Sequence, residues 1–160
     1  MKTKWSIAGL VGNKERDSLL MVNEDSLWGL PAGKLEPQLN DGKNWEVLIP
    51  RLTLQCEILE ETRVYVDTRN MKPWGVSFDF NQSHISVGLI FVINEHRIVS
   101  GVGPMYKDEV QEARFVGRDE VLNMMSRGVI RYPKKNIPPL NSFLSGVNYY
   151  LRINNRRFTI

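Results

Sequence analysis

The chain has 160 residues, enough for one domain with its own core, and no apolar run is long enough to cross a membrane. The formal net charge of +3 is mild, and no long basic block or aromatic-interleaved basic stripe indicates a nucleic-acid interface. The single cysteine, Cys56, excludes an internal disulfide and, by itself, a zinc cluster, so we expect one soluble cytoplasmic domain over residues 1–160.

The first half of the chain predicts a hairpin, a loop and a helix. Strand-like patterns cover residues 5–11 and 18–22, with a polar turn between them. Glycine and proline punctuate residues 29–37, which predicts a loop. A helix is predicted from Pro50 to about residue 62, with Leu52, Cys56 and Leu59 on its core side. Alternatively, Asn44 caps a longer helix that Pro50 kinks.

The second half predicts further strands and two more helices. Strands are expected over residues 64–66, 74–80, 85–93 and 113–116, and the third of these is so apolar that it should be central in a sheet. Helices are expected over residues 117–125 and about 139–152. Strands mixed with helices that cover both faces predict an α/β sandwich.

Three carboxylates are grouped on the helix that begins near Pro50. Glu57, Glu60 and Glu61 are spaced i, i+3 and i+4, which places them together on one side. The simplest interpretation is a solvated acidic face, because helix surfaces are commonly rich in glutamate. The alternative is a cation site, since hard oxygen ligands suit Mg²⁺ or Mn²⁺.

The segment upstream favours the cation site. Residues 28–37 read Trp-Gly-Leu-Pro-Ala-Gly-Lys-Leu-Glu-Pro, and together with the helix they resemble the Nudix box, G-x5-E-x7-R-E-U-x-E-E-x-G-U. Gly33 matches the first glycine, residues 57–62 match E-U-x-E-E-x, and Val64 takes the final apolar position. The resemblance covers about residues 5–125. It implies a Nudix-like α/β/α sandwich with a mixed β-sheet between helices.

Four departures separate the chain from the family pattern. The arginine of the box follows the glycine by 14 positions, but Gly33 and Cys56 are 56 − 33 = 23 apart, so an insertion of nine residues is expected at about 38–46. Leu39 stands where the loop glutamate belongs, and Cys56 replaces the arginine that orients the glutamates. Arg63 replaces the closing glycine, so a left-handed conformation there would cost about 1 kcal/mol. These changes leave open whether catalysis is slowed or lost.

The resemblance also implies roles for individual residues. Glu60 and Glu61 would be the principal ligands of Mg²⁺ or Mn²⁺, and Glu57 a further ligand or the group that positions water. The backbone carbonyl of Ala32 would be an additional ligand. Glu112 is the first choice for the carboxylate that completes the site, and Glu109 the second; each has a solvated loop charge as its alternative.

Substrate contacts are predicted near the box. Lys34 and Glu36 could contact phosphate or fasten the loop, although exposed charges are common. Trp28 and Phe78 could stack on a nucleobase, yet aromatic residues in strands are more often part of the core. His84 and Cys56 are better explained as structural residues than as a base and a nucleophile.

The leading hypothesis is a metal-dependent hydrolase. It would cleave a diphosphate bond in a nucleoside diphosphate linked to another moiety, namely a nucleoside triphosphate, a nucleotide sugar or ADP-ribose. The alternative is a nucleotide- or RNA-binding regulatory module with little catalysis, which the altered box and the basic C-terminal end would explain. A plain interaction domain with an acidic helix is a third reading. We expect a nucleotide-type small molecule and no membrane as partners, and a homodimer stays open.

Overall fold

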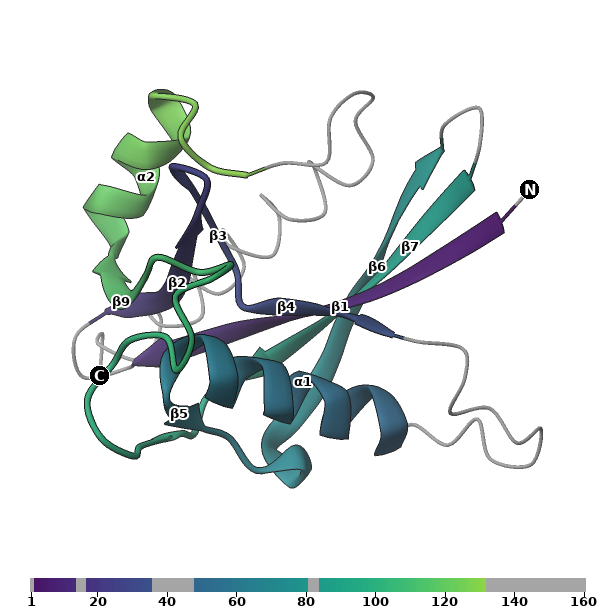
Figure 1. Cartoon of the computed structure of the whole chain (residues 1–160), viewed down its shortest axis with the longest axis horizontal. Helices are drawn as coiled ribbons and strands as arrows, with labels where there is room; N and C mark the ends of the chain where they lie inside the picture. Colours follow the sequence, from purple (N-terminus) through teal and green to yellow (C-terminus); the bar gives the residue numbers. More distant parts are fainter. Residues whose placement is uncertain (1, 14–16, 36–47, 81–83, 132–160) are drawn as a thin grey trace, which may run out of the picture.

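A mixed β-sheet with helices against it organises the chain (Figure 1). The computed structural model describes residues 2–13, 17–35, 48–80 and 84–131. The insertion predicted at 38–46 and the helix predicted at 139–152 lie outside these residues. The elements in chain order are β1 (Lys2–Asn13), β2 (Ser18–Glu24), β3 (Leu27–Gly29), β4 (Ala32–Leu35), α1 (Leu48–Thr62), β5 (Val64–Tyr65), η2 (Thr68–Asn70), β6 (Met71–Phe80), β7 (His84–Ile93), β8 (Arg97–Ile98), β9 (Glu112–Gly117) and α2 (Arg118–Ser126).

Strand β1 is the strand through which the two halves of the sheet are joined. It pairs in parallel with β7 from Lys2 to Val11, and antiparallel with both β2 and β4. In the described residues the main path runs β3-β2-β1-β7-β6, and β9 adds to β2. The near-continuous apolar run of β7 therefore lies between two partner strands, as predicted for a central strand. The predicted β1–β2 hairpin is confirmed by the pairing of Gly12 with Leu19.

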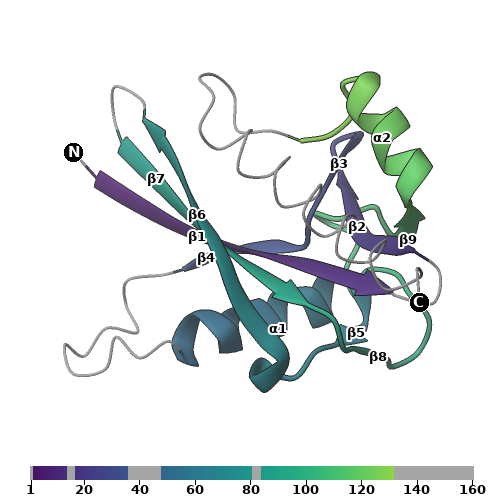
Figure 2. The same ribbon diagram turned by 180° about the vertical axis from the view of Figure 1, so that it is seen from behind.

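The two described helices cover opposite sides of the sheet, as the two views in Figures 1 and 2 show. The cluster beside α1 contains Ile7, Val11, Leu20, Leu54, Ile58, Val64, Val66, Met71, Phe91 and Ile93. The cluster beside α2 contains Leu10, Leu19, Met21, Trp28, Leu30, Ile90, Val92, Val116, Val121, Met124 and Ile130. The mixed α/β architecture predicted from the sequence is thus confirmed. Neither described helix is long and apolar enough to span a membrane.

Helix α1 begins at Leu48, so Pro50 lies in its first turn, where its missing N–H costs no helical hydrogen bond. Its predicted core face is wrong. Leu54 and Ile58 are fully buried, whereas Leu52 and Cys56 are exposed. The helix carries two apolar stripes, and contact with β1 selects one of them, because Gly9 has no side chain to keep Ile58 away. This orientation leaves Glu57 and Glu61 on the side that faces β4.

The loop predicted over residues 29–37 is wrong at residues 32–35, which form β4, while β3 ends at Gly29. Asp25 and Ser26 join β2 to β3 as a two-residue turn in which both residues have positive φ, 52° and 67°. That turn lacks the glycine by which such hairpins are usually recognised in a sequence. Strand β4 forms because its backbone pairs with β1, which places Gly33 opposite Ile7.

The end of α1 departs from what the local sequence favours. Arg63 follows the last helical residue with φ of 57°, the left-handed region that glycine adopts at least cost. Its N–H donates to the carbonyl of Leu59 at 2.8 Å, and its own carbonyl accepts from Val99 at 3.1 Å. The left-handed conformation expected at this position from the box is therefore present, and these two hydrogen bonds hold it.

We expect Arg63→Gly to stabilise the protein by about 0.5–1 kcal/mol, because the gain of relieving the left-handed strain exceeds the entropy that glycine adds to the unfolded chain. Urea denaturation measures the change. Arg63→Ala removes the same side chain but keeps the strain, so it should give no gain. Equal stabilisation by both variants would attribute the effect to the side chain and contradict this account.

Candidate active site

The two separated halves of the sequence motif meet between β4 and α1. A β-carbon at position 33 would lie 2.3 Å from the Glu57 carboxyl carbon, so only glycine leaves room for that side chain. One residue earlier, the Ala32 N–H donates to a Glu61 carboxylate oxygen at 3.0 Å. Strand β4 therefore positions two of the three glutamates, one by the space it leaves and one by a hydrogen bond.

A second segment, residues 99–110, closes the other side of the site by binding the end of α1. The N–H groups of Val99, Gly103 and Met105 donate to the carbonyls of Arg63, Thr62 and Glu60, at 3.1, 3.0 and 2.7 Å. These carbonyls lie at the helix C-terminus, where intrahelical partners run out. The bonds that cap the helix thus also fix the segment that follows Met105 beside the glutamates.

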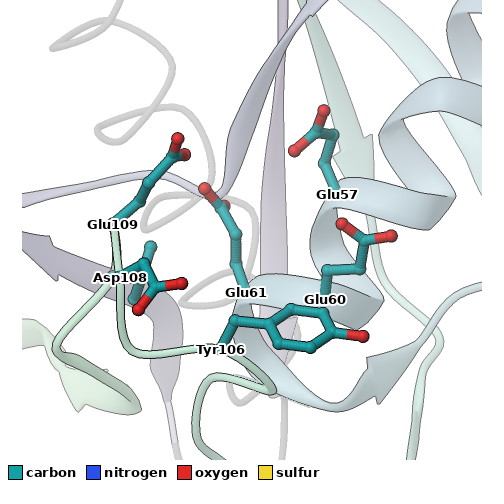
Figure 3. Close-up of a pocket in the computed structure, with 7 residues that line it drawn as sticks. Glu57, Glu60, Glu61, Tyr106, Asp108 and Glu109 are labelled. Atoms are coloured by element: carbon teal, nitrogen blue, oxygen red, sulfur yellow. The ribbon is translucent and has the colours of Figure 1, made fainter.

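The resulting pocket has a volume of about 300 Å³ and is mostly acidic. Figure 3 shows the helical glutamates on one side and the side chains of Asp108 and Glu109 on the other. The lining residues are Glu57, Glu60, Glu61, Tyr106, Asp108, Glu109 and Val110. Like charges gathered this closely repel, so the pocket is suited to a cation or to a ligand that brings one.

Burial and charge repulsion raise the pKa of two glutamates, Glu61 and Glu57. Burial raises the pKa of Glu61 to about 8, and the Glu57 charge adds to this, while the Ala32 hydrogen bond and the charge of Arg131 oppose it. Burial also raises the pKa of Glu57, with further increases from Glu60 and Glu109. A bound cation would reverse this balance, because it stabilises the ionised form of both groups.

Comparisons with known proteins agree with this geometry. No family model and no curated protein sequence matches the chain. Solved structures do: a MutT Nudix hydrolase from Burkholderia pseudomallei matches with a TM-score of 0.58 and 12% identity, over 95% of this chain and 98% of that one. A Nudix hydrolase from Nitrosomonas europaea matches with a TM-score of 0.61 and 19% identity, over 91% and 90% of the two chains. The chain has a Nudix-like fold.

A third match, from a study of MutT from Aliivibrio salmonicida and Vibrio cholerae, has a TM-score of 0.60 and 15% identity, over 95% of this chain and 99% of that one. All three matches cover nearly the whole of both chains, so the likeness extends over the Nudix-like domain as a whole. At these identities the likeness concerns the fold, and the chemistry must be argued from the side chains.

The outer carboxylate is the one that completes the site from outside α1. Within the Nudix-like fold, its two candidates, Glu109 and Glu112, lie in different places. Glu109 lines the pocket opposite the helical glutamates. Glu112 begins β9, is more than half exposed and forms an ion pair with Arg114 at 3.0 Å. The first choice from the sequence is therefore engaged elsewhere, because the strand turns its side chain toward Arg114, and the second choice faces the site.

The residues predicted to contact the substrate also lie in different places, some near the pocket and some away from it. Lys34 is exposed on β4 and close enough for its charge to lower the pKa of Glu57. Trp28 is buried, and the Arg114 guanidinium lies 4.8 Å from its ring centre, which favours the core interpretation. Glu36 and the side chain of Phe78 lie outside the described part of the chain. Cys56, at the arginine position of the Nudix box, is exposed and precedes Glu57 on α1.

Three lining residues were not predicted: Tyr106, Asp108 and Val110. They belong to a segment with no strong periodicity, and only its binding to the C-terminus of α1 brings it to the site. Asp108 and Glu109 are adjacent acidic residues, which was the available signal. Tyr106 is 68% exposed, and nothing in the local sequence distinguishes it from a surface tyrosine.

The pocket chemistry fits a divalent cation, although the carboxylates are spread rather than gathered. In the described residues no three acidic, histidine or cysteine side chains already form a ready coordination group. Magnesium normally takes few protein carboxylates together with water and substrate phosphates. The donor set is thus that of an open cation site.

The raised pKa of Glu61 predicts a pH-dependent stability. The folded protein favours the neutral carboxyl, so this contribution is present below about pH 4.5 and is lost as pH rises through about 8. Glu61→Gln keeps an acceptor for the Ala32 N–H but cannot ionise. In EDTA, its stability relative to the parent should rise between pH 5 and 9 by on the order of 1–3 kcal/mol.

Urea denaturation across this pH range measures the effect. Glu112→Gln removes one negative charge at an exposed position and serves as the matched control. A flat difference between Glu61→Gln and the parent, or a rise no larger than that of the control, would show that burial does not govern this carboxyl.

Proposed function

We propose that the chain is a metal-dependent hydrolase that cleaves a diphosphate bond in a nucleoside diphosphate linked to another moiety, namely a nucleoside triphosphate, a nucleotide sugar or ADP-ribose. The observation that carries this proposal is the meeting of Glu57, Glu61 and Glu109 at one pocket, with Gly33 and Ala32 of β4 positioning the two helical residues. The Nudix-like fold supports the reaction class.

The ligands for the cation come from both sides of the pocket. Glu60 and Glu61 on α1 would hold Mg²⁺ or Mn²⁺, with Glu57, the Ala32 carbonyl and Glu109 as further oxygen ligands. When bound, the cation supplies Lewis-acid stabilisation of the charge on the diphosphate. We place Glu109 in this role in preference to Glu112, because Glu112 is paired with Arg114 outside the pocket.

The protein's own residues perform the remaining steps. Glu57 is partly buried with a raised pKa, and a raised pKa makes its carboxylate a stronger acceptor for a proton from the attacking water. The Ala32 N–H fixes the direction in which the Glu61 carboxylate points. Lys34, on the strand beside Glu57, can contact a phosphate oxygen that extends over the pocket edge. No covalent intermediate with the protein is required.

A substrate panel tests the function. We expect hydrolysis of at least one nucleoside triphosphate, nucleotide sugar or ADP-ribose with Mg²⁺ or Mn²⁺, and its complete loss in EDTA. Glu61→Gln should lower kcat by about 100-fold or more. Separate assays for pyrophosphate and monophosphate identify the bond that breaks.

Absence of turnover with every substrate of the panel would refute the proposal that the protein is an enzyme. In that case, nucleotide binding by calorimetry that is unaffected by Glu61→Gln would support the regulatory binding module instead. Loss of both metal and nucleotide binding would favour a plain interaction domain.

The outer carboxylate has its own test. Glu109→Gln should lower kcat and weaken metal activation about 10-fold or more, because it removes an oxygen ligand from the pocket. Glu112→Gln, which changes a carboxylate three residues away, should leave both within about twofold. The reverse pattern would restore Glu112 to the role that the sequence first suggested.

Gly33 provides a test of positioning without removing any carboxylate. Gly33→Ala places a β-carbon where the Glu57 side chain lies, so Glu57 must move. We expect a loss of stability of no more than about 1 kcal/mol, because the clashing atoms belong to a flexible side chain, but a fall in kcat of about 10-fold or more. Gly117→Ala, where a β-carbon meets nothing within 4 Å, is the control. Unchanged kcat in Gly33→Ala would separate Glu57 from catalysis.

A further inference from the structure

An ion pair lies on the same face of the sheet as the carboxylate pocket. Arg131 follows α2, and its backbone N–H donates to the Trp28 carbonyl at 2.6 Å, beside a parallel bridge between Trp28 and Ile130. Its Nη1 pairs with a carboxylate oxygen of Glu24 at the end of β2. The backbone contact fixes where the side chain starts, and Glu24 fixes one corner of the guanidinium.

The strand register connects this pair to the pocket. Arg131 lies beside Gly29, and Gly29 is the cross-strand partner of Val22. Val22 packs against Val110, which lines the pocket. The charge of Arg131 also lowers the pKa of Glu61. Arg131 is therefore connected through Gly29, Val22 and Val110 to the wall of the pocket.

One edge of this guanidinium has no partner. In the described chain, Nε and Nη2 of Arg131 are buried and make no hydrogen bond. A buried donor without an acceptor costs roughly 1–3 kcal/mol, so such groups call for an explanation. A β-carbon at position 29 would lie 3.6 Å from Nε and 3.7 Å from Nη2, so this edge of the guanidinium lies beside Gly29, where there is no side chain to offer an acceptor.

The arrangement selects the kind of acceptor. Nε and Nη2 present parallel N–H groups, which suit two acceptor atoms side by side. Glu24 already neutralises the guanidinium charge, and the nearby glutamates add negative charge, so a neutral partner is favoured over another anion. The side chain of Arg131 as a whole is 37% exposed, so it is not sealed inside the core.

We propose that Arg131, held by Glu24, is a specificity-determining residue that binds a nucleobase with two adjacent acceptors, as found on guanine (O6 and N7) or cytosine (O2 and N3). Arginine pairs with the guanine edge in this bidentate way in nucleic-acid recognition. Adenine and uracil have no two acceptors side by side and cannot satisfy both N–H groups. The inference rests on the proposed function, since it places the phosphates at the carboxylate pocket.

Binding of nucleoside monophosphates tests the inference without hydrolysis. Isothermal titration calorimetry of the full chain with Mg²⁺ compares GMP, CMP, AMP and UMP, none of which has a diphosphate bond to cleave. We expect GMP or CMP to bind at least about 10-fold more tightly than AMP and UMP. The comparison of GMP with CMP identifies the base, and 7-deaza-GMP, which lacks N7, should lose the advantage if guanine is the ligand.

Variants then test whether the base preference comes from the Nε and Nη2 groups of Arg131. Arg131→Lys keeps the charge but not the paired N–H groups, and Arg131→Met combined with Glu24→Gln removes the ion pair without stranding a charge. Both should bind the four nucleotides within about threefold of one another. Arg127→Lys, an exposed arginine at the end of α2, should behave as the parent does.

Three results would overturn the proposal: equal binding of the four nucleotides by the parent, no binding of any of them, or a base preference that survives in Arg131→Lys. Thermal unfolding of each variant confirms that it is folded. Because a nucleoside monophosphate has no diphosphate bond, a base preference without any hydrolase activity on the substrate panel would leave this inference intact while refuting the enzymatic proposal.

Discussion

The contact between β4 and α1 is the constraint on which the site depends. Gly33 has no side chain, so the Glu57 carboxyl can lie directly over the strand, and the neighbouring Ala32 N–H holds Glu61. Both contacts require β4 to pair with β1 in the observed register, with Gly33 opposite Ile7. A shift of one residue would turn a side chain toward α1 and remove the room for Glu57. The register of the sheet and the geometry of the candidate site thus depend on the same strand pairing.

Gathering these carboxylates lowers the stability of the folded protein when no metal is bound. Glu57 and Glu61 are held close together and partly out of water, so ionising them opposes folding. The opposite face of α1 offsets this, because Leu54 and Ile58 are fully buried against the sheet. A pocket of unpaired carboxylates is stable here only because the other side of the same helix is anchored in the core. The repulsion that weakens the free protein is also what would favour a cation.

The end of α1 connects the two walls of the pocket. Its last carbonyls accept hydrogen bonds from the segment that carries Tyr106 and Glu109. The terminal carbonyls of any helix need hydrogen-bond partners. Here the segment that carries Glu109 provides them. The left-handed Arg63 belongs to the same arrangement, because its carbonyl takes part in it. The altered closing position of the motif therefore keeps the backbone geometry that a glycine would give.

The sequence by itself determined the mixed α/β class, the helix that carries Glu57, Glu60 and Glu61, and the central place of β7, because periodicity and spacing are local properties of the chain. The tertiary structure decided the rest. Strand β4 forms where glycine and proline predict a loop, because pairing with β1 outweighs local propensity. The core face of α1 was settled by Gly9 and the sheet, and Glu109 rather than Glu112 reaches the pocket because backbone bonds to α1 direct its segment there. Arg131 meets Gly29 across about a hundred residues, and a contact at that separation leaves no local pattern from which it could be predicted.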